Sequence, residues 1–348
     1  MSSLPAVVVI LVFLAASLAT WGAGVQLSRT TDELDRRLNL GDALGGMVLL
    51  AVAGSLPEVA ITVSGAASGH IELAAGNLIG GIATATMVLV ICDLFAPRPL
   101  TYLVGSLIPV LEGLLVVMVV AAVLMGALLP RSASIAGRVS PGSIAIVLLW
   151  VGGVWVLNRA RSHPAWRVEA AGSRPGRPHH RVRHPNPHPT ARHSTARVAL
   201  TFGAACLVTL VAGVLLEVTG SDLAGRAGID GVVFGATVLS LATALPEISS
   251  GIEAVRLGDH RLAVADVFGG NAFQLCLFLV ADLVALKPAL PTAGAANSWL
   301  AALAIALTAV YVAGMIIRPT RPNRLGPDSI LACVLYAIGI LGLLRIAQ

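Results

Sequence analysis

The tripeptide Leu-Pro-Glu occurs twice in this chain, each time in the middle of a long apolar stretch, as Leu56-Pro57-Glu58 and Leu245-Pro246-Glu247. A carboxylate at membrane depth costs at least about 2.5 kcal/mol, so it usually faces a protein interior or a water-filled cavity and marks an ion pathway. Proline within a helix removes a backbone hydrogen bond and breaks the helix locally. Two such breaks, each beside a carboxylate, predict a polar site inside a membrane-embedded helical protein.

The apolar stretches are long enough to cross a membrane. The chain has 348 residues, of which 56% are hydrophobic and only 12% are charged, whereas about a quarter of the residues in soluble domains are charged. Windows of about 20 apolar residues predict an all-α polytopic membrane protein with ten transmembrane helices. The expected spans are 4–27, 41–68, 71–95, 102–128, 141–158, 198–219, 229–255, 261–286, 295–317 and 327–346.

The two Leu-Pro-Glu segments indicate a duplication, because a shift of 189 residues superimposes them and their surroundings without a gap. The same shift aligns Gly69 with Gly258, Leu73 with Leu262, Gly80 with Gly269, and Asp93 with Asp282. Ordered matches of this kind over about forty residues seldom arise by chance. Since each copy holds five spans, the second copy must have the opposite orientation in the membrane, which predicts two inverted five-helix repeats.

The expected organisation is a first repeat over 1–158, a basic linker over 159–197 and a second repeat over 198–348. The linker is rich in proline, arginine and histidine, a composition that cannot bury a core and that suits contact with anionic lipid headgroups. Most arginines lie in the linker and in the loops on its side of the membrane. The positive-inside rule therefore predicts a multi-pass protein of the cell membrane with both termini outside. Topology accounts for the net charge of +5, so a nucleic-acid partner is not implied.

The chemistry of the two breaks favours a cation. Each proline frees backbone carbonyls, near Gly54 and Thr243, and unwound backbone is tolerated at membrane depth only where it lines a cavity or is buried in protein. Glu58 and Glu247 together would cancel the double charge of Ca²⁺, which takes six to eight oxygen ligands. Without the ion, paired carboxylates take up a proton, which permits exchange. The alternative is that both prolines only kink helices whose glutamates are hydrogen-bonded.

The segments around the breaks carry a resemblance to a known family. They read A-G-S-L-P-E at 53–58 and G-N-L-I-G-G at 76–81, then A-T-A-L-P-E at 242–247 and A-D-V-F-G-G-N at 265–271. The chain thereby resembles the sodium/calcium exchanger family of the cation/calcium exchanger superfamily, whose two alpha-repeats carry G-T-S-x-P-E and G-N-x-x-G-S-N-x-x-[ND]. The resemblance implies that Glu58 and Glu247 bind the transported ion and that the first and sixth spans move to expose the site to alternate sides. The neutral ligands that it implies are Ser55, Thr243, Asn271 and Gln274.

The sequence departs from the family pattern at several of the positions that supply neutral oxygens. Each half keeps one hydroxyl before the x-P-E, and Gly81 and Gly270 replace the serine of the second motif. The last two polar positions of that motif are Ile82 and Ala85 in the first half. Fewer neutral oxygens suit a proton-coupled cycle.

These features predict a secondary active cation antiporter that exchanges Ca²⁺ for Na⁺ or H⁺ by alternating access, with inorganic cations and the lipid bilayer as partners and no bound cofactor. The same two carboxylates would serve a Na⁺/H⁺ antiporter, and a cation channel would use them without a counter-ion. No nucleophile–base pair or zinc-type cluster in the sequence indicates a membrane enzyme.

Further acidic residues lie within or near the expected spans. We expect a structural or vestibule role for Asp93 and Asp282, since they recur at equivalent positions near span ends. Asp266 is either paired with backbone or part of the ion path. Glu112 is either a proton-path group or hydrogen-bonded to a neighbouring helix. Glu217 lies near the end of the expected span 198–219 and is interpreted as interfacial.

Overall fold

The computed structural model of the protein describes residues 4–38, 51–162, 194–290, 294–317 and 325–347. Within these ranges the chain is helical and has no strand, apart from one isolated antiparallel bridge between Ile135 and Val139. The all-α prediction is therefore confirmed.

The helices of the N-terminal part are α1 (Ala6–Leu38), α3 (Leu56–Ser68), α4 (Ile71–Phe95), α5 (Leu100–Leu103), α6 (Ile108–Ala127), η2 (Arg131–Ala133) and α7 (Pro141–Ser162). Those that follow are α8 (Thr195–Ala227), α9 (Gly231–Phe234), η3 (Gly235–Leu239), α10 (Ser240–Thr243), α11 (Leu245–Arg256), α12 (His260–Gln274), α13 (Leu277–Ala285), α14 (Ala295–Ile317) and α15 (Pro327–Ile346).

Eight helices in the described ranges are long and apolar enough to cross a membrane, or nine if the bent pair Gly231–Thr243 and Leu245–Arg256 counts as one span. The remaining expected span, 41–68, begins within residues 39–50, which lie outside the described residues. Its described helical parts are residues 51–54 and α3. The described chain thus accounts for a polytopic membrane protein, while the predicted total of ten spans stays a prediction.

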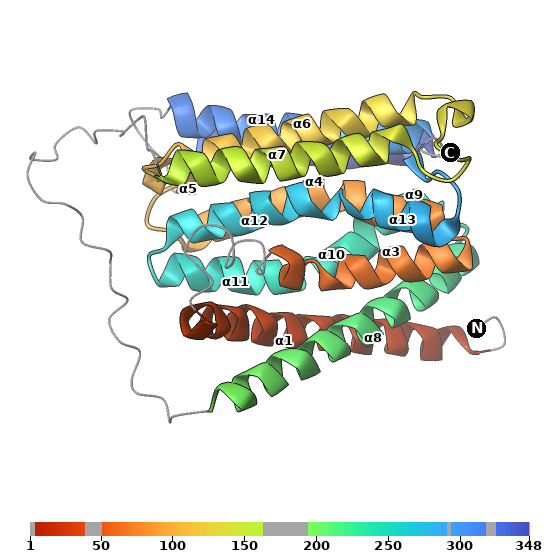
Figure 1. The fold of residues 1–348 in the computed structure, drawn as a ribbon, viewed down its shortest axis with the longest axis horizontal. Helices are drawn as coiled ribbons and strands as arrows, with labels where there is room; N and C mark the ends of the chain where they lie inside the picture. Colours follow the sequence, from red (N-terminus) through yellow and green to blue (C-terminus); the bar gives the residue numbers. More distant parts are fainter. Residues whose placement is uncertain (1–3, 39–50, 163–193, 291–293, 318–324, 348) are drawn as a thin grey trace, which may run out of the picture.

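Two helices, α1 and α8, lie on the outside of the bundle. In Figure 1, α1 and α8 lie side by side along one edge of the molecule, cross each other and run in opposite directions. α6, α7 and α14 lie along the opposite edge, and α3, α4, α11 and α12 fill the layer between. Both chain termini lie at one end of the molecule, and α7 ends and α8 begins at the other. The middle layer is where the two interrupted helices meet.

Helix boundaries recur at the offset found in the sequence. The first helix of each half, α1 and α8, begins and ends at aligned residues. α3 and α11 begin at the two aligned leucines, and in Figure 1 they extend from the middle of the molecule towards opposite ends. Gly69 and Gly258, which follow these helices, both have a left-handed backbone, with φ of 84° and 80°, a conformation that glycine adopts without strain.

The aligned aspartates make the same local contact. The Oδ1 atom of Asp93 accepts a hydrogen bond of 2.7 Å from the backbone N–H of Leu100, and that of Asp282 accepts one of 2.6 Å from Ala289. Each bond spans seven residues, and both carboxylates are buried. A buried carboxylate that satisfies a turn's backbone N–H stabilises that turn. The structural role expected for this pair is confirmed.

The helices reach slightly into the predicted linker. α7 continues to Ser162 and α8 begins at Thr195, so both ends of the segment 159–197 are helical. Its remainder, 163–193, lies outside the described residues, and so does the predicted lipid contact. The halves 1–158 and 198–348 and their inverted relation stay predictions at this stage.

Candidate ion-binding site

Both Leu-Pro-Glu segments begin a new helix. α3 and α11 start at the leucine, with the proline in the first turn. The first backbone bonds of these helices run from the Val59 N–H to the Ser55 carbonyl and from the Ile248 N–H to the Ala244 carbonyl, both at 3.0 Å. In the second half the helical segments before and after the break are bent by 44°, and the segment before it contains a π-helical stretch, η3. The predicted interruptions are present in both halves.

Glu58 lies in the first turn of α3 and is 7% exposed. The side chain of Thr243, from the other half of the chain, lies beside its carboxylate, and the Thr243 hydroxyl donates a 3.2 Å hydrogen bond to the Ser240 carbonyl. The second carboxylate oxygen of Glu58, Oε2, is buried and has no hydrogen-bond partner among the described residues. The two predicted ligands Glu58 and Thr243 are therefore neighbours, and one buried carboxylate oxygen next to them is left without a partner.

Glu247 holds the equivalent position in the first turn of α11 but is only partly buried. It lines a cavity with Ser55, Ser250 and Asp266. Its carboxylate lies close enough to those of Glu58 and Asp266 for their charges to repel it. The structure thus brings together Glu58, Glu247, Ser55 and Thr243 around the two breaks.

The two predicted amide ligands lie on α12 and differ in their contacts. Asn271 is fully buried, and neither atom of its amide has a hydrogen-bond partner among the described residues. Gln274 is also buried, and its Nε2 donates a 2.8 Å bond to the Leu78 carbonyl on α4. An unsatisfied buried polar group costs about 1–3 kcal/mol, a cost that an oxygen-seeking cation would relieve at Asn271. The role of these residues as ion ligands stays a prediction.

The glycines that replace the family's serines face site residues. A Cβ atom on Gly81 would lie 3.3 Å from Gln274 Nε2, and one on Gly270 would lie 3.7 Å from Glu247 Oε1. Position 81 is therefore tight, whereas position 270 has ordinary contact distance to a carboxylate. A hydroxyl at either position would border the site, which explains how the glycines reduce the number of neutral oxygens.

Two glycines that the sequence analysis did not single out pack directly on the breaks. A Cβ atom on Gly24 of α1 would lie 2.5 Å from Cβ of Pro246, and one on Gly213 of α8 would lie 2.6 Å from Cβ of Ala60 and 3.0 Å from the carbonyl oxygen of Pro57. Positions 24 and 213 are also related by the offset of 189. Each outer helix therefore touches the broken helix of the opposite half. The recurrence of glycine at aligned positions was the sequence signal for this contact.

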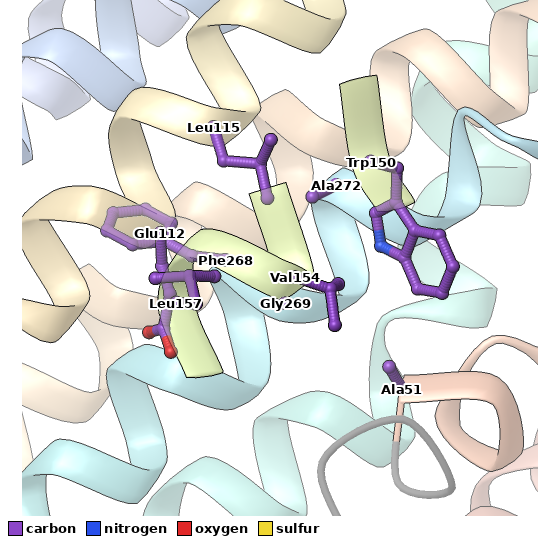
Figure 2. A pocket seen from close by; sticks show the side chains of 9 residues that line it. All are labelled: Ala51, Glu112, Leu115, Trp150, Val154, Leu157, Phe268, Gly269 and Ala272. Atoms are coloured by element: carbon purple, nitrogen blue, oxygen red, sulfur yellow. The ribbon is translucent and has the colours of Figure 1, made fainter. Parts of the chain in front are cut away.

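Glu112 on α6 is bound to a neighbouring helix. Its Oε1 pairs with Nη2 of Arg161 on α7 at 2.8 Å, and the glutamate side chain is 3% exposed. Figure 2 shows Glu112 at the edge of a hollow that is otherwise lined mainly by apolar side chains, including Leu157 and Phe268. The hydrogen-bonded alternative is confirmed for this residue.

Glu217 lies inside the protein, while its interpretation as interfacial stays a prediction. Its side chain is fully buried, Oε2 accepts a 2.7 Å bond from the Ser64 hydroxyl, and Oε1 lies 2.8 Å from His70 Nδ1. The helix α8 continues to Ala227, beyond the apolar segment that defined the expected span, so residue 217 lies inside the helix and packs on α3. A hydropathy window does not include the polar end of a long helix, so the expected span ended before the helix does.

Asp266, the residue with two expected alternatives, lies on the cavity wall with Glu247. Its Oδ2 accepts a 2.9 Å bond from the Ser250 hydroxyl. Within the described ranges no group of three or more His, Cys, Asp and Glu side chains is arranged to hold a metal ion. A cation at the breaks would therefore rely on two carboxylates together with hydroxyl, amide and backbone oxygens, the ligand types that hard cations prefer.

Known proteins with similar sequences indicate the family of this chain. The family model described as sodium/calcium exchanger protein matches residues 8–158 and 197–345. CaxA of Alkalimonas amylolytica is 24% identical over 318 residues, covering 91% of this chain and 93% of that protein. The inner membrane protein YrbG of Escherichia coli K12 is 27% identical over 248 residues, covering 71% and 70%.

Solved structures share the fold over nearly the whole chain. The H⁺/Ca²⁺ exchanger CAX superposes with a TM-score of 0.62 at 16% identity, covering 97% of this chain and 91% of that one. The sodium-calcium exchanger NCX_Mj, soaked without Na⁺ and Ca²⁺, superposes with a TM-score of 0.60 at 17% identity, covering 97% and 100%. These similarities establish the architecture in which the two breaks lie.

Proposed function

The chain belongs to the sodium/calcium exchanger protein family, and from that premise we propose that it is a secondary active antiporter that exchanges Ca²⁺ for Na⁺ or H⁺ by alternating access. The observation that carries the proposal is the meeting of the two interrupted helices. Glu58 and Glu247 lie in the first turns of α3 and α11, and the Thr243 side chain of one half lies beside the Glu58 carboxylate of the other.

In the proposed site the two carboxylates neutralise the ion and neutral oxygens complete its shell. Ser55 lines the same cavity as Glu247, and Thr243 lies beside Glu58. Asn271 would contribute an amide oxygen that has no other partner among the described residues. Gln274 donates through Nε2 to Leu78, which leaves its Oε1 oxygen as an acceptor. These four residues are the proposed neutral ligands.

Loss of the ion would leave two like charges close together at low dielectric, a state that favours uptake of a proton. A proton on one carboxylate would restore a site of low net charge that can change its exposure to the two sides of the membrane. Arrival of Ca²⁺ would displace that proton. The two transported species would thus be coupled, because they compete for the same two carboxylates.

A proton as the counter-ion has specific support. Na⁺ needs several neutral oxygens in addition to a carboxylate, and Gly81 and Gly270 offer none where the family pattern has serine. The solved structures that share the fold include an H⁺/Ca²⁺ exchanger and a sodium-calcium exchanger at similar TM-scores, so the fold alone does not choose. The site chemistry favours H⁺ over Na⁺.

The proposed topology has two inverted repeats, 1–158 and 198–348, in the cell membrane with both termini outside. Three observations support it: α1 and α8 run antiparallel, their bounds recur at the sequence offset, and both termini lie at one end of the molecule. The end of the molecule where α7 ends carries Arg159 and Arg161 in the last turn of that helix, as expected for the cytoplasmic side.

The test is ion flux in proteoliposomes. Radiolabelled Ca²⁺ uptake should require an opposing gradient of protons or of Na⁺, imposed one at a time with membrane potential clamped. Uptake that ignores every second-ion gradient would indicate a channel. Proton flux driven by Na⁺ without any Ca²⁺ dependence would indicate a Na⁺/H⁺ antiporter instead.

A further inference from the structure

Glu217 is a carboxylate inside a membrane helix that the proposed ion site does not use. It is fully buried on α8, and each of its oxygens is bonded, Oε2 to the Ser64 hydroxyl at 2.7 Å and Oε1 to His70 Nδ1 at 2.8 Å. Both partners belong to the segment that comprises α3 and the turn before α4. The cost of placing a charge at such depth is met only by these contacts. They tie the outer helix α8 to the helix that carries Glu58.

His70 connects this buried carboxylate to water. Its side chain is 47% exposed, in contrast to the fully buried side chain of its partner. The imidazole lines a surface hollow together with Glu72, Ser221 and Lys287. This hollow lies at the end of the molecule where both termini are found, because α3 and α8 both end there. The imidazole therefore borders water at that end of the molecule.

The other half of the chain has a different residue at the aligned position. Subtracting the offset of 189 from position 217 gives position 28, which is Ser28 on α1. Ser28 lines the cavity that also contains Glu247, Ser250 and Asp266. At equivalent places, one outer helix thus lines a cavity with a short hydroxyl, and the other is held by a bonded, buried carboxylate. The two halves of the chain differ at this position.

We propose that the His70–Glu217 pair is a gate that holds α8 against α3 and α4 and keeps the candidate ion site closed at the end of the molecule where both termini lie. The proposal rests on the proposed alternating access, because opening that side requires α8 to separate from α3. Separation must break both bonds of Glu217. The gate is a positioning device: neither residue contacts the transported ion.

The charge of Glu217 gives both contacts their strength. A hydrogen bond to an ionised group is roughly twice as strong as one between neutral groups. Replacing this carboxylate by an amide therefore weakens both contacts while keeping the shape of the side chain.

The other charged groups around the pair are engaged or balance each other. Asp222 pairs with Arg226 on α8 at 2.7 Å, and the Asp230 carboxylate accepts the backbone N–H groups of Val232 and Val233. Glu72 and Lys287, which line the hollow beside His70, carry opposite charges. α1 has no ionisable side chain between Ala6 and Ser28, and α9 has none at all. On α3 the only ionisable group is Glu58, in its first turn.

The experiment measures the gate without relying on transport. Spin labels at Ser68 on α3 and Gly225 on α8, both exposed, would be introduced into a background in which the four native cysteines are replaced. Distance distributions of Glu217→Gln and of the wild type, recorded at one pH, should show the separated population rising by roughly fivefold in the variant, the ratio expected between a neutral and a charge-assisted hydrogen bond.

Glu217→Gln keeps the shape of the side chain and can still accept from Ser64, so it removes the charge alone. Ser64→Ala and His70→Ala each remove one bond of Glu217, and each should also raise the separated population. Ser221→Ala is the matched control, because Ser221 lines the same hollow but is not one of the two partners of Glu217. A separated population in Glu217→Gln equal to that of the wild type would overturn the gate. Because no ion gradient enters the measurement, a failure of Ca²⁺ transport leaves this result unaffected, and a failed gate leaves the antiporter proposal intact.

Discussion

The two Leu-Pro-Glu segments have the same sequence and the same local break, yet their surroundings differ. Glu58 is 7% exposed and lies beside Thr243, whereas Glu247 is partly exposed and lines a cavity with Asp266. One carboxylate is enclosed, and the other borders a cavity. Repeated sequence therefore produces a repeated fold around an asymmetric site, which is the condition for a site that opens to one side at a time.

The largest effect is expected at the two glutamates themselves. Glu58→Gln and Glu247→Gln each remove one of the two charges that would neutralise Ca²⁺, and each should lower Ca²⁺ flux by at least about a hundredfold, since a lost charged ligand exceeds 3 kcal/mol. Glu253→Gln is the control, because Glu253 also lies on α11 but is exposed. Normal flux in either site variant, with the protein folded, would show that the two breaks do not share one ion.

The next effect tests the contact of the outer helices with the breaks. Gly24→Ala and Gly213→Ala each add a methyl group where the neighbouring atoms lie 2.5 Å and 2.6 Å away, an overpacking that costs about 1–3 kcal/mol. Both should lower the melting temperature and reduce flux about tenfold. Gly22→Ala and Gly203→Ala are matched controls on the same helices, because nothing lies within 4 Å of a Cβ atom at either position. Equal losses of flux in the two variants would support equivalent roles for the two contacts. Unchanged flux in both variants would show that these contacts are not part of the transport mechanism.

A gain of function should sharpen the difference between the halves. Gly270→Ser places a hydroxyl beside the Glu247 carboxylate without a clash, whereas Gly81→Ser meets Gln274 at 3.3 Å. The first substitution should raise the ratio of Na⁺-driven to H⁺-driven Ca²⁺ uptake about threefold, because Na⁺ gains a neutral oxygen. The second should lower uptake under both gradients by displacing Gln274. An unchanged ratio in the first variant would indicate that the glycines do not select the counter-ion.

The smallest effect on transport is expected at the aligned aspartates. Asp93→Ala and Asp282→Ala each leave the backbone N–H of a turn without its acceptor, at a cost of about 2 kcal/mol of unfolding free energy. Thermal unfolding should shift downward in both variants, while Ca²⁺ flux per folded protein should change less than twofold. A selective loss of flux without destabilisation would assign these carboxylates to the ion path.

Sequence predicted the features that follow from local rules. The helical class follows from the long apolar segments, and the interruptions follow from the missing N–H of Pro57 and Pro246. The enclosed position of Glu58 follows from the cost of a charge at membrane depth. These predictions need only the chain's own chemistry.

The contacts between distant segments could not be predicted in the same way. Whether Glu112 bonds Arg161 or serves a proton path depends on how α6 packs on α7, which hydropathy does not encode. Glu217 was missed because the apolar window ends before the helix does, and its partners Ser64 and His70 lie about 150 residues away in the chain. Which of the two carboxylates is enclosed depends on the conformation of the protein, and a motif that is the same in both halves cannot predict it.

Equilibrium Ca²⁺ binding to the purified protein, measured by titration calorimetry in two buffers of different protonation enthalpy, tests the shared site most directly. The account predicts one ion per chain with release of protons in the wild type, and no binding in Glu58→Gln or in Glu247→Gln. Full binding by either single variant would contradict it, since one carboxylate would then suffice.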